Sequence, residues 1–209
     1  MDNFVLTHTR STTLPFLPEL NLRLADEVIP VWQESERDAP PFWAFAWPGG
    51  TALARFVLDH PELVRGRRVL DLASGCGVVA IAAARCGAAS VVATEIDEYA
   101  AAAIEHNARV NGVPVRVHLG DVLDSNPDSY PDQVDVILAG DVFYSRDMSL
   151  RVLAFLQRWA SRPVYVGDPG RAYAPKSGFE RVAEYDVPVN RDVEDSDHKH
   201  TAILRKIAI

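Results

Sequence analysis

The sequence predicts an α/β protein built on one doubly wound sheet of seven strands, mostly parallel and closed by antiparallel pairing at its C-terminal end. From residue 67 onward, short apolar runs alternate with helical segments, which is the pattern of a parallel sheet covered by helices on both faces. The last two apolar runs have little helix between them. This absence predicts an antiparallel hairpin at one edge of the sheet.

Continuous apolar runs or alternating patterns identify the expected strands, and amphipathic or Ala-rich segments identify the expected helices. The strands are 67–73, 90–96, 113–120, 134–140, 162–168, 179–187 and 199–209. The helices are 51–60, 78–86, 97–112 and 147–160. Thr51 and Asp97 stand where N-cap residues are expected, and Gly87 and Gly112 stand where a helix is expected to end.

The first fifty residues are less regular. Residues 21–32 are apolar without a clean period, so the sequence leaves them undecided between strand and helix. Residues 36–42 are charged and contain proline, which predicts a loop. Residues 42–50 hold two Trp and two Phe before a Pro-Gly-Gly sequence. We treat residues 1–50 as an N-terminal extension of the regular core.

Length and composition limit the possible functions. The 209 residues have room for one domain with a substantial core, and 48% hydrophobic with 24% charged residues indicates a globular chain. The net charge is −8, which argues against nucleic acid as a partner because phosphate neutralisation needs clustered Lys and Arg. We expect no membrane partner, since no apolar run approaches a membrane span. The N-terminus resembles no signal or transit peptide, so a bacterial cytoplasmic protein is expected.

The turn after the first core strand is rich in glycine. Gly75 and Gly77 allow a ligand to approach the backbone, and the following helix offers free N–H groups. With Ala80 they satisfy the pattern G-x-G-x-x-G/A. Glu95 follows about twenty residues later at the end of the next strand, where a carboxylate can accept hydrogen bonds from both ribose hydroxyls. This pattern alone does not separate a dinucleotide from another adenosine-containing ligand.

Asp71 distinguishes between these ligands. It lies immediately before the glycine turn, where a carboxylate repels a pyrophosphate and favours a cation. Glu95, Asp121 and Asp141 follow the next strands, so an acidic rim is expected at one edge of the sheet. S-adenosylmethionine (SAM) carries an ammonium and a sulfonium and suits such a rim better than NAD or ATP. The alternative is that these acids only cap helices near the strand ends.

Two segments, VLDLASGCG (69–77) and TEID (94–97), resemble the SAM-binding motif of class I, seven-strand methyltransferases, whose fold is Rossmann-like. Those proteins carry an acid, a glycine turn and a second acid, and here Ala73 replaces the first of three glycines. The resemblance implies SAM as cofactor, S-adenosylhomocysteine as product, and no metal. The expected cofactor-binding residues are Trp47, Gly49, Asp71, Ala73, Gly75, Gly77, Glu95, Ile96 and Asp121.

Three further segments carry a narrower resemblance. They are 41–61 with its WPGG sequence, GDVFY (140–144) and VGDPGR (166–171). Together they resemble the lysine methyltransferase family that modifies the β-subunit of electron transfer flavoprotein, and the likeness runs from Pro41 to Arg171. It implies a SAM-dependent protein N-lysine methyltransferase acting on that β-subunit.

The domain organisation that this resemblance implies is a single class I methyltransferase domain over residues 1–209. Residues 1–50 would contribute to the active site, and residues 67–209 would form the SAM-binding core. The alternatives are methylation of another protein such as a ribosomal protein, of a small amine or of a nucleic acid. A non-catalytic SAM-binding module is a further alternative.

Asp141 and Tyr144 are the expected catalytic residues. Methyl transfer needs a neutral amine, yet a free Lys has a pKa near 10.4, so the site must attract the ammonium and then favour loss of its proton. The two residues form D-x-x-Y, which in the resembling family lies at the mouth of the target-lysine channel. Asp141 would accept a hydrogen bond from the amine, and Tyr144 would wall the channel. The alternative is a turn in which Asp141 caps the next helix and Tyr144 packs against its neighbours.

Three further residues are expected near the site. The Trp47 indole would cover the methionine half of SAM with a cation–π contribution, or else be an ordinary buried Trp. Asp168 and Arg171 complete the expected substrate-binding set with Asp141 and Tyr144. Asp168 would contact residues flanking the target lysine or pin its own loop through Arg171. His198 and His200 lie beside acids, and we expect a solvated acidic loop there and not a metal site.

Overall fold

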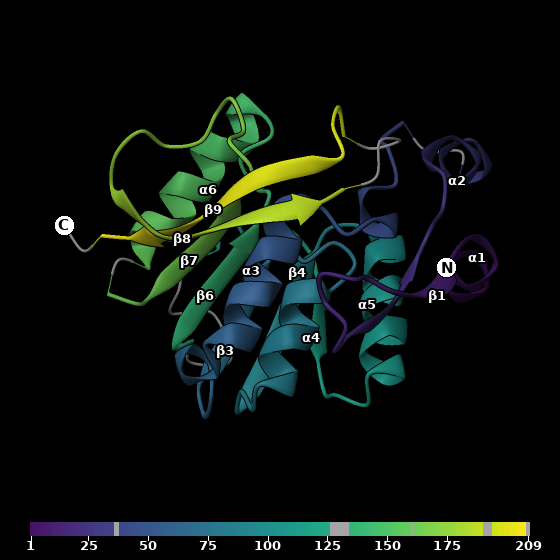
Figure 1. The fold of residues 1–209 in the computed structure, drawn as a ribbon, viewed down its shortest axis with the longest axis horizontal. Helices are drawn as coiled ribbons and strands as arrows, with labels where there is room; N and C mark the ends of the chain where they lie inside the picture. Colours follow the sequence, from purple (N-terminus) through teal and green to yellow (C-terminus); the bar gives the residue numbers. More distant parts are fainter. Residues whose placement is uncertain (36–37, 126–133, 160, 190–193, 208–209) are drawn as a thin grey trace.

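The computed structural model describes residues 1–35, 38–125, 134–159, 161–189 and 194–207. Its main sheet has the strand order β5-β4-β3-β6-β7-β9-β8 (Figure 1). The parallel strands are β3 (Arg68–Leu72), β4 (Ser90–Glu95), β5 (Arg116–Leu119), β6 (Val136–Gly140) and β7 (Val164–Asp168). The antiparallel strands are β8 (Phe179–Pro188) and β9 (His198–Lys206). The predicted fold class is confirmed.

The strand order reverses beside β3. The chain runs outward from β3 to β4 and β5 and then returns to β6 on the other side of β3. In such sheets a crevice opens beyond the carboxyl ends of the strands at this switch point, and ligands bind there. The carboxyl ends of β3 and β6 are therefore the place to look for a site.

Helices cover both faces of the sheet because successive strand side chains point to opposite faces. Val69 of β3 packs in the cluster that contains α3 (Pro48–Asp59) and α4 (Val78–Arg85). Leu70 packs in the opposite cluster with α6 (Arg146–Arg158). Figure 1 shows α3 and α4 in front of the sheet, and α5 (Glu98–Val110) beside them.

The predicted helix starts have mixed outcomes. Asp97 caps α5 as expected, because its side chain accepts a hydrogen bond from the Tyr99 N–H at 2.9 Å. The prediction for Thr51 is wrong, since α3 begins at Pro48 and Thr51 is buried inside it. Proline has no backbone N–H. It suits the first position of a helix because an N–H there would have no hydrogen-bond partner within the helix.

The N-terminal segment forms its own elements beside α5. They are α1 (Asp2–His8), the hairpin of β1 (Arg10–Thr13) and β2 (Asn21–Leu24), α2 (Val28–Ser35) and a 3-10 helix at Phe42–Ala44. A second short 3-10 helix, Pro61–Leu63, follows α3. The undecided segment 21–32 thus contains a strand followed by the start of a helix. The Asn107 Oδ1 atom accepts a hydrogen bond from the Arg23 N–H at 2.6 Å, which ties the hairpin to α5.

This docking has a consequence for the site. Trp43 and Phe45 pack with Ala100 and Ala103 of α5, so the aromatic segment 42–47 is held near the carboxyl ends of the strands. No helix that the structure describes combines the length and the apolar character needed to cross a membrane.

Candidate active site

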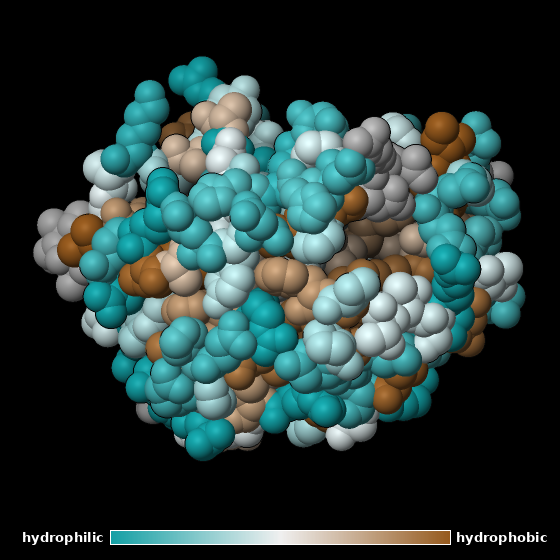
Figure 2. All heavy atoms as spheres, in the orientation of Figure 1, coloured by the Kyte–Doolittle hydropathy of each residue, from teal (hydrophilic) through white to brown (hydrophobic). Residues whose placement is uncertain are grey.

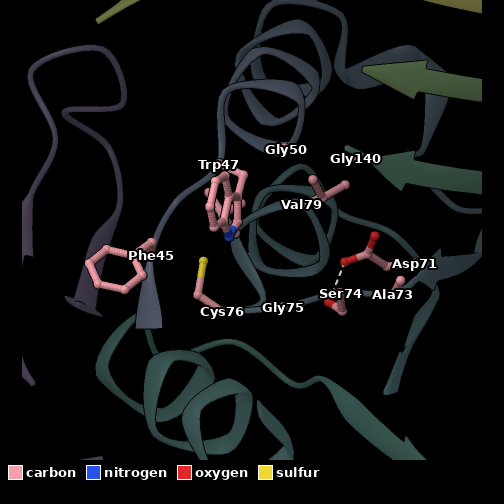
Figure 3. A pocket seen from close by; sticks show the side chains of 11 residues that line it. Phe45, Trp47, Gly50, Asp71, Ala73, Ser74, Gly75, Cys76, Val79 and Gly140 are labelled. Atoms are coloured by element: carbon pink, nitrogen blue, oxygen red, sulfur yellow. Dashed lines mark hydrogen bonds between the residues drawn. The ribbon is translucent and has the colours of Figure 1, made fainter. Parts of the chain in front are cut away.

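An open pocket lies at the carboxyl end of β3, between the aromatic segment and the glycine turn. In Figure 3, Phe45 and Trp47 face the turn, and Asp71 lies on the side opposite Phe45. We call it the strand-end pocket. It is lined by Phe45, Trp47, Gly50, Asp71, Ala73, Ser74, Gly75, Cys76, Val78, Val79 and Gly140.

The glycine turn has a left-handed backbone at three positions. Ala73, Gly75 and Gly77 have φ values of 52°, 58° and 84°. A Cβ atom on Gly77 would lie 3.2 Å from the Ile104 side chain, so this glycine allows α4 to begin close to α5. A Cβ atom on Gly75 would meet no atom within 4 Å, so this part of the turn is open. Ala73 carries a side chain in the same conformation, which costs about 1–2 kcal/mol for a non-glycine residue.

Asp71 is a buried carboxylate at the end of β3, with 1% of its surface exposed. Its Oδ2 atom accepts hydrogen bonds from the Ser74 hydroxyl and, at 3.0 Å, from the Ala80 N–H. Burial raises the pKa of Asp71 to about 7, against the lowering effect of these two hydrogen bonds. Among the described residues no Lys, Arg or His pairs with it, so its charge is available to a cationic ligand.

Glu95 joins the end of β4 to the glycine turn. Its Oε1 atom accepts a hydrogen bond from the Gly75 N–H at 2.7 Å, and its Oε2 atom accepts one from the Ile96 N–H at 3.0 Å. Burial raises the pKa of Glu95 despite these hydrogen bonds. Ile96 is exposed, so it is free to contact a ligand held by Glu95.

Asp121 has different surroundings from the other expected rim residues. Its Oδ1 atom accepts a hydrogen bond from the Leu123 N–H at 3.0 Å, and its Oδ2 atom pairs with Arg151 of α6 at 2.9 Å. The pKa of Asp121 is lowered because these two interactions outweigh its partial burial. Asp121 does not line the strand-end pocket, and its expected contact with the cofactor stays a prediction.

Asp141 follows β6 and is buried, with a left-handed φ of 56°. Its Oδ2 atom accepts a hydrogen bond from the Gly49 N–H in the first turn of α3. Its backbone N–H donates to the Gly167 carbonyl at 3.0 Å. Ser145, and not Asp141, caps α6, so the expected alternative role in capping the next helix is wrong. Asp141 instead holds the start of α3 against β6 and β7.

Glycines make this close approach possible. A Cβ atom on Gly49 would lie 2.3 Å from the Gly167 oxygen, and one on Gly140 would lie 2.5 Å from the Gly50 Cα atom. The WPGG sequence is therefore needed for packing α3 onto the strand ends. Gly50 lines the strand-end pocket, whereas Gly49 faces Asp141.

Arg171 connects Asp141 to the C-terminal part of the chain. Its Nε atom donates to Asp141 Oδ1 at 2.8 Å, and its Nη2 atom lies 2.6 Å from Glu194 Oε1. Its guanidinium carbon lies 5.9 Å from the centre of the Trp47 ring. Burial raises the pKa of Asp141 to about 6, although Arg171 acts in the opposite direction.

Asp168 pins its own loop, which is one of the two expected roles. Its Oδ2 atom accepts hydrogen bonds from the backbone N–H groups of Gly170 and Arg171 at 2.9 and 3.2 Å. Its Oδ1 atom is buried without a hydrogen-bond partner, and burial raises the pKa of this carboxyl. Asp168 therefore sets the position of the Arg171 backbone.

An aromatic cluster lies beside these charges. The Tyr144 ring is stacked on Phe42 with centroids 6.0 Å apart, and Phe42 lies 5.8 Å from Trp47. Tyr144 is 54% exposed and so does not pack in the core. Trp47 is partly exposed and lines the pocket, so it is not an ordinary buried Trp. Phe42 was not among the residues expected at the site, although the aromatic run 42–47 contains it.

The remaining candidates lie elsewhere. His200 pairs with Asp186 and Glu184 on the β8–β9 hairpin. In the parts of the chain that the structure describes, no group of three or more His, Cys, Asp or Glu residues is arranged to hold a metal ion. A second, largely apolar pocket lies between the β1–β2 hairpin, Phe45–Ala46 and Pro188–Val189. The face drawn in Figure 2 is otherwise mostly hydrophilic, with hydrophobic residues in a hollow and in small patches.

Comparisons with known proteins agree with this arrangement. The model of the family "Ribosomal protein L11 methyltransferase (PrmA)" matches residues 49–141. The electron transfer flavoprotein β-subunit lysine methyltransferase of Rattus norvegicus is 37% identical over 198 residues, which cover 90% of this chain and 74% of that protein. The ribosomal protein L11 methyltransferase of Thermotoga petrophila is 42% identical over 89 residues, which cover 43% of this chain and 33% of that protein.

A solved structure is similar in fold. The crystal structure of the ribosomal protein L11 methylase from Lactobacillus delbrueckii subsp. bulgaricus aligns with a TM-score of 0.50 at 22% identity, covering 78% of this chain and 81% of that one. The match to the rat protein is far more extensive in sequence and spans both the glycine turn and the D-x-x-Y segment. This chain belongs to the electron transfer flavoprotein β-subunit lysine methyltransferase family, a family of SAM-dependent protein-lysine methyltransferases.

Proposed function

We propose that this protein methylates lysine side chains of the β-subunit of electron transfer flavoprotein. The observation that carries the proposal is the extent of the match to the rat enzyme, which covers 90% of this chain. The L11 methyltransferase match covers only 43% of it. The match to the flavoprotein methyltransferase extends over about twice as much of this chain as the match to the L11 methyltransferase, which favours the flavoprotein as substrate.

The strand-end pocket supports SAM as the cofactor. Bound SAM supplies a methyl group on a positively charged sulfur. Asp71 is buried and Glu95 is partly buried, no basic side chain neutralises either carboxylate among the described residues, and both suit a cationic ligand. Gly75 leaves open space above the turn. We propose that Asp71, Glu95, Trp47 and the turn hold SAM. Gly49, Gly77, Ile96 and Asp121 stay predictions from the family resemblance.

Asp141 and Tyr144 are proposed to handle the target lysine. With a pKa of about 6, Asp141 is ionised at neutral pH and attracts the ammonium. The Oδ1 atom of Asp141 is bound by Arg171, whereas Oδ2 accepts from the Gly49 N–H and has a second acceptor site, so Oδ2 can orient the amine while these bonds remain. Partial burial raises the pKa of Tyr144, so its hydroxyl stays protonated and adds no charge. The stacked rings of Tyr144 and Phe42 are exposed in the ligand-free protein, and we propose that a bound substrate covers them and shields the amine from water, which favours the neutral amine.

A second candidate substrate is a ribosomal protein. It is favoured by the L11 methyltransferase model, which matches residues 49–141. That segment contains the glycine turn and ends at Asp141, so it supports the cofactor site more than the choice of substrate. The bacterial cytoplasmic location expected from the sequence stays a prediction.

The test is a methyl-transfer assay with labelled SAM. Purified electron transfer flavoprotein and purified ribosomes are offered in parallel tubes, with Asp141→Asn as the inactive control. We expect label on lysines of the flavoprotein β-subunit, located by mass spectrometry. Label on a ribosomal protein alone would support the second candidate. Measurable SAM binding without label in either tube would contradict both.

A further inference from the structure

Glu194, in the acidic stretch before β9, contacts the active site. Glu194 has 5% of its side-chain surface exposed, which is unusual for a carboxylate in a loop. Its Oε1 atom lies 2.6 Å from Arg171 Nη2, and its Oε2 atom lies 3.4 Å from Lys199 Nζ. A buried carboxylate is tolerated only where cations or hydrogen bonds replace water, and here Arg171 does so most closely.

Arg171 is held from three sides. Asp141 Oδ1 accepts from both its Nε and Nη2 atoms, Glu194 binds the same Nη2 atom, and the Trp47 ring lies against the guanidinium. The guanidinium is planar and rigid, so the contact between Glu194 and the Nη2 atom also fixes the Nε atom, which donates to Asp141. Glu194 therefore restrains the group that orients Asp141.

Charge gives Glu194 a second effect. Asp141 and Arg171 alone form a neutral pair, and an approaching lysine ammonium would meet the Arg171 cation beside the Asp141 carboxylate. Glu194 adds a second carboxylate beside Arg171, and Lys199 lies 3.4 Å from its other oxygen, so these four groups together carry no net charge. Glu194 lies closer to Arg171, at 2.6 Å, than Lys199 lies to Glu194, so it still offsets part of the field of Arg171 that an approaching ammonium meets.

We propose that Glu194 is a positioning residue that holds Arg171 against Asp141 and Trp47, so that the Asp141 carboxylate remains aimed at the target amine. The inference rests on the proposed lysine methylation and extends it to the C-terminal hairpin. Glu194 itself contacts neither the strand-end pocket nor the Tyr144 ring among the described contacts.

The test compares Glu194→Gln with Glu180→Gln. Glu180 lies on the same hairpin and pairs with Arg205 at the surface, so its neutralisation is the matched control. We expect Glu194→Gln to lower kcat/KM for lysine methylation on the order of tenfold or more, since small misplacements of reacting groups are costly. SAM affinity should stay within about twofold of wild type, because Asp71 and Glu95 are untouched. Glu194→Asp, which keeps the charge, should recover part of the loss.

A second readout does not depend on activity. The Arg171 Nε–H signal in NMR, assigned with Arg171→Lys, should exchange slowly with solvent in the wild type and in Glu180→Gln, and quickly in Glu194→Gln. Unchanged exchange and unchanged kcat/KM in Glu194→Gln would overturn the proposal. The proposal would also be overturned if Glu194→Gln lost SAM affinity and thermal stability to the same extent as kcat/KM, because such a loss indicates a general structural role. If the wild type methylates no lysine, the proposed function fails, and the exchange rates alone decide whether Glu194 holds Arg171.

Discussion

The acids at the strand ends fall into two groups that differ in how their charge is balanced. On the side of β3 and β4, Asp71 and Glu95 are bound by backbone N–H groups and a serine hydroxyl, and no basic side chain pairs with them among the described residues. On the side of β6 and β7, Asp141 is paired with Arg171. Asp71 and Asp141 are buried, Glu95 is partly buried, and the pKa values of all three are raised.

This difference separates two tasks within one acidic edge. An unbalanced buried carboxylate gains most from a bound cation, which fits the cofactor side. A carboxylate with its own cation is fixed in place before any ligand arrives, which fits a group that must orient a nucleophile. Asp71 and Asp141 are both buried, so the position of Arg171 is what distinguishes these two carboxylates.

The largest effect should come from Asp141→Asn. Asparagine keeps the shape and tolerates the positive φ at this position, so the fold should persist. We expect kcat to fall by about 10²–10⁴-fold because the anionic acceptor for the amine is lost. SAM affinity, measured by calorimetry, should change by less than about threefold. A comparable loss of SAM affinity would move Asp141 to the cofactor side and remove the distinction.

Glu95→Gln should have the opposite pattern. A hydrogen bond to a charged group is worth about 1.5–3 kcal/mol, so SAM affinity should fall by about ten- to a hundredfold. At saturating SAM, kcat should be nearly unchanged. Glu98→Gln, an exposed neighbour in α5, is the control and should bind SAM as the wild type does. Unaltered affinity in Glu95→Gln would contradict its ribose contact.

The pH dependence of SAM binding should report Asp71. Its pKa of about 7 means that the carboxyl becomes protonated as the pH falls, and it then no longer attracts a cation. SAM affinity should weaken by at most about tenfold for each pH unit below 7, and Asp71→Asn should flatten this profile. A profile that is equally steep in Asp71→Asn would assign the dependence to another group.

The stability of the ligand-free protein should change with pH in the opposite direction from SAM affinity. The folded-state pKa of Asp71 lies above its unfolded value, so the folded state holds the proton more tightly. Relative to Asp71→Asn, the wild type should therefore lose stability as the pH rises through about 7. Thermal unfolding of the two proteins at pH 5 and pH 8 measures this difference, and a constant difference would contradict the raised pKa.

The smallest effect is expected from Ala73→Gly. Ala73 has a φ of 52°, where glycine is favoured, so the substitution should raise the free energy of unfolding by up to about 1 kcal/mol. SAM affinity should stay close to wild type because the turn keeps its shape. Chemical denaturation checks the stability, and a loss of stability would indicate that the Ala73 methyl group makes packing contacts that outweigh the strain.

The sequence predicted the fold well because buried parallel strands read as continuous apolar runs, and glycines end the helices between them. It failed at Thr51, where the side chain suited a cap but Pro48 began α3 one turn earlier. It left 21–32 undecided because a strand and a helix follow each other there within a few residues. Local preference does not decide such short elements, and packing against α5 does.

The sequence by itself determined that four acids stand at strand ends, because parallel strands bring their carboxyl ends to one edge of the sheet. It did not determine which of them lack a counter-ion. Arg171 reaches Asp141 across 30 residues and Glu194 across 23, and no local pattern encodes these pairings. Only the folding of the C-terminal hairpin onto β7 brings the three together, so the electrostatic division of the site belongs to the tertiary structure.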